Sequence, residues 1–141
     1  MLLNVSYNDK NITEKIDGAV GKPFPLRERF AMGGIGSPKL HIAKASMEIQ
    51  NLLILDNNLN TCNIEMRPKG IIVRFRSLLE TYGLVIPYYK LNIYKGDFAL
   101  YSIYIDHHFI KIKSDTKAIQ SYFKKILDYK ADNAPTSIED L

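Results

Sequence analysis

The sequence predicts a mainly β domain: a curved antiparallel sheet of seven strands, partly open like an unclosed barrel, capped by a C-terminal helix. Three observations carry this prediction. Short runs of alternating apolar residues follow one another closely between residues 46 and 113. The links between these runs are too short for the crossovers that parallel strands need. One amphipathic pattern of helical period follows the last run.

The composition is that of a single soluble globular domain. The chain has 141 residues, of which 46% are apolar and 24% charged. A chain of this length buries about two-thirds of its unfolded surface, so it needs no disulfide to fold, and its one cysteine, Cys62, cannot form an internal one. No run approaches the ~20 apolar residues of a membrane helix. The first residues do not resemble a secretory signal, so a cytoplasmic location is expected.

The first 45 residues are expected to form an extended N-terminal arm. Glycine and proline are frequent between residues 18 and 38, and no apolar period continues through them. The glycine-rich segment 32–38 lacks the lysine and the flanking elements of a phosphate-binding loop. Apolar side chains such as Phe24 and Phe30 would not remain in water. We therefore expect the arm to pack on the domain or on a partner subunit, the latter giving a homo-oligomer.

Seven short strands are expected within the domain of residues 46–130. Each combines apolar alternation with a turn signal at its end. The expected strands are 47–54, 62–67, 71–76, 82–86, 88–94, 98–105 and 108–113. In the strand 71–76, one face is apolar and the other is expected to be largely wet.

A helix is expected to follow the last strand. Apolar residues recur there at the spacing of one helical face, at Ile119, Tyr122, Phe123, Ile126 and Leu127. Ser114 or Asp115 is expected to cap this helix, which runs to about Lys130. It has the size needed to close the open end of a curved sheet. Residues 131–141 carry three acidic and no basic side chains and are expected to form a flexible tail.

Besides the order of elements, three stretches have characteristic local sequence patterns. They are residues 70–75, residues 83–88 with Ile86-Pro87-Tyr88, and residues 122–127 of the helix. From 47 to 130, the chain resembles the pleckstrin-homology-like superfold, specifically its small bacterial and GRAM-type members. The resemblance implies seven strands in two near-orthogonal sheets, closed by a C-terminal helix. The chain departs from the pattern in two ways: it has no tryptophan, and no dense basic loop joins its first two strands.

The positive charge is concentrated in the middle of the chain. The net charge is +4, and residues 62–130 carry twelve basic against six acidic side chains. Basic side chains interleaved with tyrosines suit acidic peptides, anionic headgroups or single-stranded nucleic acid. The candidate binding residues are Arg67, Lys69, Arg74, Arg76, Tyr88, Tyr89, Lys90, Tyr94, Lys95, Lys111 and Lys113. The alternative is a solvated face whose charges prevent strands from pairing at the edge.

These residues predict a non-enzymatic binding or adaptor module. The favoured partner is an unknown protein, bound through the tyrosine, arginine and lysine surface or through the sheet edge. The alternative is peripheral binding to anionic membrane headgroups through the basic patch, whereas nucleic acid is a less favoured partner. A small-molecule or enzymatic role in the cleft between sheet and helix ranks last, because no catalytic constellation is visible.

No metal site, catalytic residue or cofactor is expected. His107 and His108 are adjacent, and neighbouring residues of a strand point to opposite faces, so the two histidines could not bind one metal ion. His41 lies far away in the sequence, and Cys62 has no second thiol. The turn that contains His107 is expected to be a solvated hairpin turn.

Overall fold

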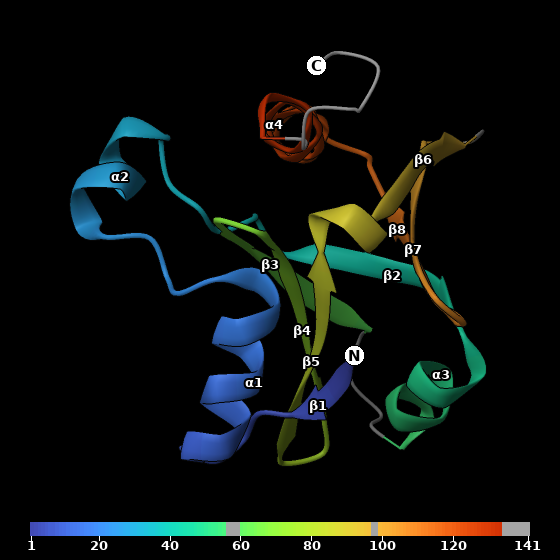
Figure 1. Cartoon of the computed structure of the whole chain (residues 1–141). Helices are drawn as coiled ribbons and strands as arrows, with labels where there is room; N and C mark the ends of the chain where they lie inside the picture. The colour runs from blue at the N-terminus through green and yellow to red at the C-terminus, as the bar shows by residue number, and fades with distance from the viewer. Residues whose placement is uncertain (56–59, 97–98, 134–141) are drawn as a thin grey trace.

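The computed structural model describes residues 1–55, 60–96 and 99–133 (Figure 1). The strands in this part of the chain are β1 (Leu2–Asn4), β2 (Leu40–Ala45), β3 (Thr61–Arg67), β4 (Gly70–Ser77), β5 (Glu80–Pro87), β6 (Asn92–Gly96), β7 (Leu100–Ile105) and β8 (His108–Lys113). The helices are α1 (Lys10–Val20), α2 (Leu26–Ala31), α3 (Met47–Ile54), the 3-10 turn η1 (Tyr88–Lys90) and α4 (Lys117–Asp132). All the strands pair antiparallel in the order β1-β5-β4-β3-β2-β8-β7-β6.

The expectation of a mainly β chain with a C-terminal helix is confirmed. The strand count was wrong: the described sheet has eight strands and not seven. The expected strand 47–54 is the helix α3, in which Ile49 and Leu53 are buried one helical turn apart. The expected strand 98–105 begins at Leu100, because Ala99 lies in the preceding turn with a positive φ of 55°, and residue 98 lies outside the described residues.

The N-terminal 45 residues are not extended throughout. They contain α1, α2 and two strands of the sheet, and β2 lies in its middle, between β3 and β8. Helix α1 begins where the Asp9 carboxylate accepts a hydrogen bond of 2.8 Å from the Asn11 N–H. Its buried Ile16 and Val20 lie four residues apart, a helical spacing that the neighbouring Gly18 and Gly21 obscure in the sequence.

The sheet folds over at β2. A register shift between Ile42 and Lys44 bends this strand, which pairs with β3 on one side and with β8 on the other. Figure 1 shows β2 running across the direction of β3, β4 and β5. The sheet therefore has two halves that share β2: β3, β4 and β5 with β1 at the edge, and β8, β7 and β6.

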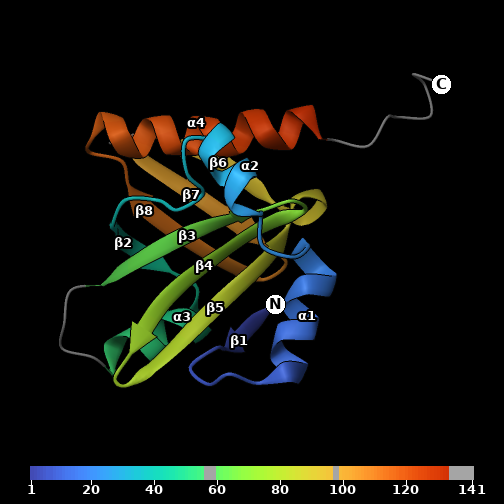
Figure 2. The same ribbon diagram turned by 90° about the vertical axis from the view of Figure 1, so that its left-hand side faces the viewer.

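Helix α4 lies across one end of the folded sheet (Figures 1 and 2). Phe123 is fully buried and stacks on Tyr101 of β7, with the ring centroids 4.3 Å apart. The predicted cap was wrong, because the Thr116 hydroxyl caps α4 and accepts from the Ile119 N–H at 3.2 Å. The helix extends to Asp132, the second residue of the predicted tail, and the rest of that tail from residue 134 lies outside the described residues.

The two halves of the sheet differ in what covers their outer faces. Helix α1 lies on β4 and β5 (Figure 2), where Ile16 and Val20 bury Ile72 and Val85. The second face of β4, expected to be largely wet, is thus partly covered. No described helix covers the outer face of β6, β7 and β8 (Figure 1). None of the helices within the described ranges is long and apolar enough to cross a membrane.

Candidate functional site

The structure distributes the eleven candidate binding residues over several surfaces. Arg67, Arg74 and Arg76 lie on β3 and β4, whereas Lys111 and Lys113 lie on β8 in the other half of the sheet. The remaining candidates lie in the β3–β4 turn, in η1 and on β6, namely Lys69, Tyr88, Tyr89, Lys90, Tyr94 and Lys95. The single surface that the sequence suggested is therefore divided between two faces and their borders.

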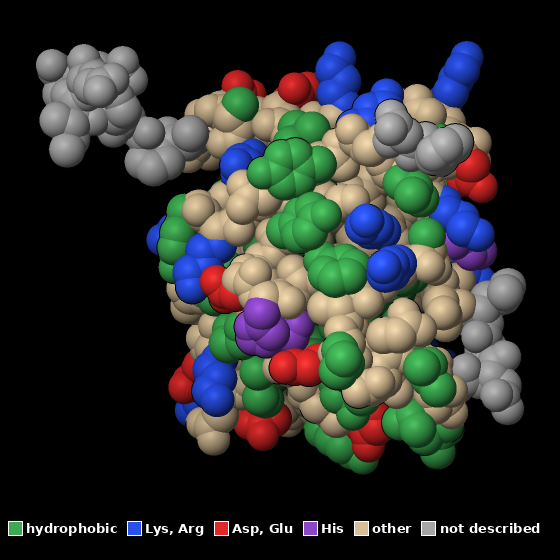
Figure 3. Space-filling model, turned by 90° about the vertical axis from the view of Figure 1, so that its right-hand side faces the viewer, with side chains coloured by type: hydrophobic (Ala, Val, Ile, Leu, Met, Phe, Trp, Pro, Cys, Tyr) green, Lys and Arg blue, Asp and Glu red, His purple; other side chains and the backbone are tan. Residues whose placement is uncertain are grey.

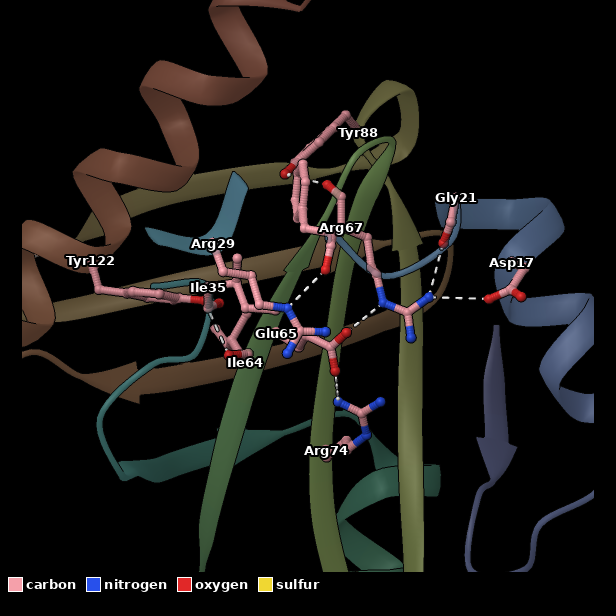
Figure 4. Close-up of polar contacts among 11 residues, drawn as sticks. Asp17, Gly21, Arg29, Ile35, Ile64, Glu65, Arg67, Arg74, Tyr88 and Tyr122 are labelled. Atoms are coloured by element: carbon pink, nitrogen blue, oxygen red, sulfur yellow. Dashed lines mark hydrogen bonds and ion pairs between the residues drawn. The ribbon is translucent and has the colours of Figure 1, made fainter. Parts of the chain in front are cut away.

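Arg67 is buried by the fold. Its side chain is 8% exposed and forms an ion pair with Glu65 (Figure 4). One guanidinium nitrogen, Nη1, donates to the carbonyl of Gly21 at 2.8 Å and to the Asp17 carboxylate at 3.2 Å. Glu65 also accepts from Nη1 of Arg74 at 2.6 Å. Two carboxylates thus balance two guanidinium groups, and this cluster joins α1 to the sheet.

Glu65 is held ionised by these partners. Burial raises the pKa of its carboxyl group, but the hydrogen bonds and charges of Arg67 and Arg74 lower it by more, so the pKa lies below its ordinary value. Asp17 and Glu65 together balance the charges of Arg67 and Arg74, so the cluster as a whole carries no net positive charge. Arg67 was expected on an exposed binding surface, and in the structure it is buried between α1 and the sheet.

Tyr88 is also buried and unavailable to a partner. Its hydroxyl donates to the carbonyl of Arg67 at 3.2 Å, and its ring lies 5.6 Å from that of Tyr129 (Figure 4 shows the first contact). Burial raises the pKa of this phenol. Tyr88 thus holds η1 against the end of β3. Its neighbours Tyr89 and Lys90 are exposed, and Lys90 faces Asp106 at 3.9 Å.

The uncovered outer face of β6, β7 and β8 carries a row of three aromatic rings, one from each strand. We call Tyr94, Tyr104 and Phe109 the aromatic stripe. Ring centroids are 5.7 Å apart for Tyr94 and Tyr104 and 6.0 Å apart for Tyr104 and Phe109. Tyr94 is 60% exposed. Figure 3 shows hydrophobic side chains gathered on this face with lysines and arginines beside them.

Lysines lie beside the aromatic stripe on the same face. Alternation along β8 places Lys111 and Lys113 with Phe109. The register of the sheet places Lys44 of β2 directly opposite Lys111. Like charges in directly opposed positions destabilise a sheet, and no acidic side chain of the described residues forms an ion pair with these three lysines. As far as the described residues go, the face therefore combines apolar rings with positive charge that no ion pair balances.

Sequence reasoning found only part of this surface. It named Tyr94, Lys111 and Lys113, but it missed Tyr104 and Phe109 of the stripe, together with Lys44. The sequence shows the alternation in β7 and in β8. The register that pairs Tyr104 with Phe109 cannot be derived from the sequence of either strand alone. Lys44 was missed because β2 was assigned to the arm.

A second exposed feature lies at the tip of the β4–β5 hairpin. Leu79 is 89% exposed, and Leu78 has a positive φ of 57°, which is uncommon for leucine. The groove beside the tip is lined by both leucines and by Lys39, Arg74 and Arg76, among others. Apolar side chains and basic groups thus meet at this end of the molecule, opposite α4 (Figure 2).

The histidines form a third feature. His107 lies in the β7–β8 turn rather than on the strand, since Ile105 pairs with His108. The alternation that separates neighbours on a strand therefore does not apply, and the two imidazole rings lie 4.1 Å apart. Both approach Glu48 of α3. The sequence argument that these histidines could not share one ion was wrong.

Comparisons with protein-family models, with curated protein sequences and with solved structures find no match for this chain.

Proposed function

We propose that the chain is a non-catalytic binding module of pleckstrin-homology-like fold that binds an acidic segment of a partner protein on the outer face of β6, β7 and β8. Two features support the fold: strands β2 to β8 form two halves that share β2, and α4 closes one end. The observation that carries the binding proposal is the aromatic stripe with its adjoining lysines on an uncovered sheet face.

Charge defines the chemistry of the partner. Lys44, Lys111 and Lys113 lie together on this face, and none of them forms an ion pair with an acidic residue in the described part of the chain. An acidic side chain placed between Lys44 and Lys111 would remove their mutual repulsion. Positive charge at the border of an aromatic patch also accelerates the approach of an acidic partner, an effect that salt weakens.

The sheet edge beside the stripe fits an extended segment. Within the described residues, β6 pairs with β7 alone, so the backbone groups on its other side are available to a new strand. A peptide added there would lie next to Tyr94, and side chains on one of its faces would reach the stripe. Backbone pairing would supply affinity at this edge. Because β8 and β2 are the third and fourth strands from it, the acidic residues that reach Lys111 and Lys44 belong to the continuation of the segment across the face, along the aromatic stripe.

Peptide selection followed by charge reversal tests this function. Short peptides selected from a random library are expected to be rich in Asp and Glu, and Lys111→Glu should weaken their binding by about tenfold or more. Lys124→Glu, an exposed site on α4, makes the same charge change elsewhere and should have little effect. Equal losses in both variants, or selected peptides without acidic residues, would contradict the proposal.

The hairpin tip favours a second candidate function, peripheral binding to an anionic membrane. Leu78 and Leu79 could enter the bilayer surface while Lys39 and Arg76 contact headgroups. The protein should then sediment with vesicles containing phosphatidylserine and not with phosphatidylcholine alone, and salt should reduce binding. Leu79→Ser and Arg76→Glu should each reduce it severalfold, with Lys124→Glu as control. Unchanged binding in both tip variants would exclude the tip as the contact.

A further inference from the structure

Three side chains with metal-binding atoms converge where α3 meets the β7–β8 turn. Glu48 lies in the first turn of α3, His107 in the β-turn, and His108 at the start of β8. Asp106 takes a positive φ of 51°, which allows the chain to reverse within two residues. This tight turn places the His107 ring beside that of His108, and both face the helix.

The distances between donor atoms are close to those of a metal centre. Glu48 Oε1 lies 3.3 Å from His107 Nε2, and Glu48 Oε2 lies 3.8 Å from His108 Nε2. All the ligand atoms lie within 4.8 Å of one another. Donors held about 2.0–2.1 Å from a tetrahedral Zn²⁺ are about 3.3–3.4 Å apart. We propose that Glu48, His107 and His108 bind a divalent transition metal ion of the zinc class.

The donor set defines the kind of ion. Two imidazole nitrogens and one carboxylate oxygen suit Zn²⁺ and its first-row neighbours, whereas Ca²⁺ and Mg²⁺ prefer oxygen ligands. Three protein ligands leave at least one coordination position for water or for a group of a partner. Glu48 and His107 are exposed, so an ion can reach them directly from solvent.

His108 is the buried ligand of the proposed site, and the surrounding residues restrict the movement of its side chain. Its side chain is 7% exposed, and its Nδ1 has no hydrogen-bond partner among the described residues, so its polar contact is made by Nε2 towards Glu48.

The site adjoins the proposed binding face but does not depend on it. Phe109 of the aromatic stripe directly follows His108, and Figure 3 shows histidine and acidic side chains below the hydrophobic ones. The metal site needs only the three ligands. Metal binding can therefore be tested independently of peptide binding.

Metal titration of the full chain without an affinity tag tests the site. We expect calorimetry to show saturable binding of one Zn²⁺ per chain, and Co²⁺ to give the visible absorption of a tetrahedral complex. His107→Ala and Glu48→Gln should each weaken Zn²⁺ binding by about tenfold or more. These two ligands are exposed, so the variants are expected to fold, which circular dichroism would verify.

His41→Ala supplies the matched control, because His41 is the remaining histidine of the chain and lies on β2. It should leave Zn²⁺ affinity unchanged. Absence of saturable Zn²⁺ binding would overturn the proposal. So would equal losses in His41→Ala and His107→Ala, or displacement of Zn²⁺ by an equal concentration of Mg²⁺.

Discussion

Replacing Phe123 with alanine is expected to lower the free energy of unfolding by about 3–5 kcal/mol. Phe123 is fully buried beneath α4 and stacks on Tyr101, so alanine would leave a cavity between helix and sheet and remove the ring contact. Urea denaturation followed by circular dichroism measures the change.

Leu127→Ala is the matched control for this prediction. Leu127 is a neighbour on the same helix but is 38% exposed, so its truncation should cost much less. A loss for Phe123→Ala no larger than that for Leu127→Ala would show that α4 does not close the sheet through this face.

Replacing Arg67 with alanine is expected to cost about 3–5 kcal/mol, because removing one partner of a buried ion pair leaves the others uncompensated. Asp17 and the carbonyl of Gly21 would lose their donor, and α1 would lose its polar contact with β3. Arg76→Ala removes an exposed arginine of the same sheet half and should change stability by less than about 0.5 kcal/mol.

The cost of Arg67→Ala should depend on pH. The pKa of Glu65 is lower in the folded state than in the unfolded state, so its ion pairs stabilise the protein above the unfolded pKa of about 4.3. This contribution is lost as pH falls through the folded pKa. Denaturation at neutral and at acidic pH should therefore show a smaller difference between wild type and Arg67→Ala in acid. A difference independent of pH would mean that Glu65 contributes little.

Strand β8, most of β7 and helix α4 could be predicted because their signals are local, whereas the expected strand 88–94 is the turn η1 followed by β6. Alternation in 108–113 and the helical spacing around Phe123 each lie within one element. Helix α3 was misread because a strand and a helix of eight residues both fit its apolar run, and only burial decides between them. Strand β2 has few local signals, since partners on both sides stabilise it.

The candidate sites depended more on distant contacts. Arg67 looks like a surface residue until α1 brings in Asp17, which lies 50 residues away in the sequence. In the sequence, His107 and His108 are expected to point to opposite faces of a strand. In the structure His107 lies in a turn, and both side chains approach Glu48 of α3. In both cases the missing information was a partner from another element, which no pattern within the strand contains.

The central position of β2 has a consequence for synthesis of the chain. Residues 40–45 leave the ribosome well before their pairing partner β8, which ends at Lys113. Until then one edge of β2 has no native partner, and such edges are where incomplete chains associate with one another. The folded sheet can close only after β8 has been translated, and its long-range pairings favour slow folding. Nascent chains that stop before β8 are therefore the form of this protein most prone to aggregate.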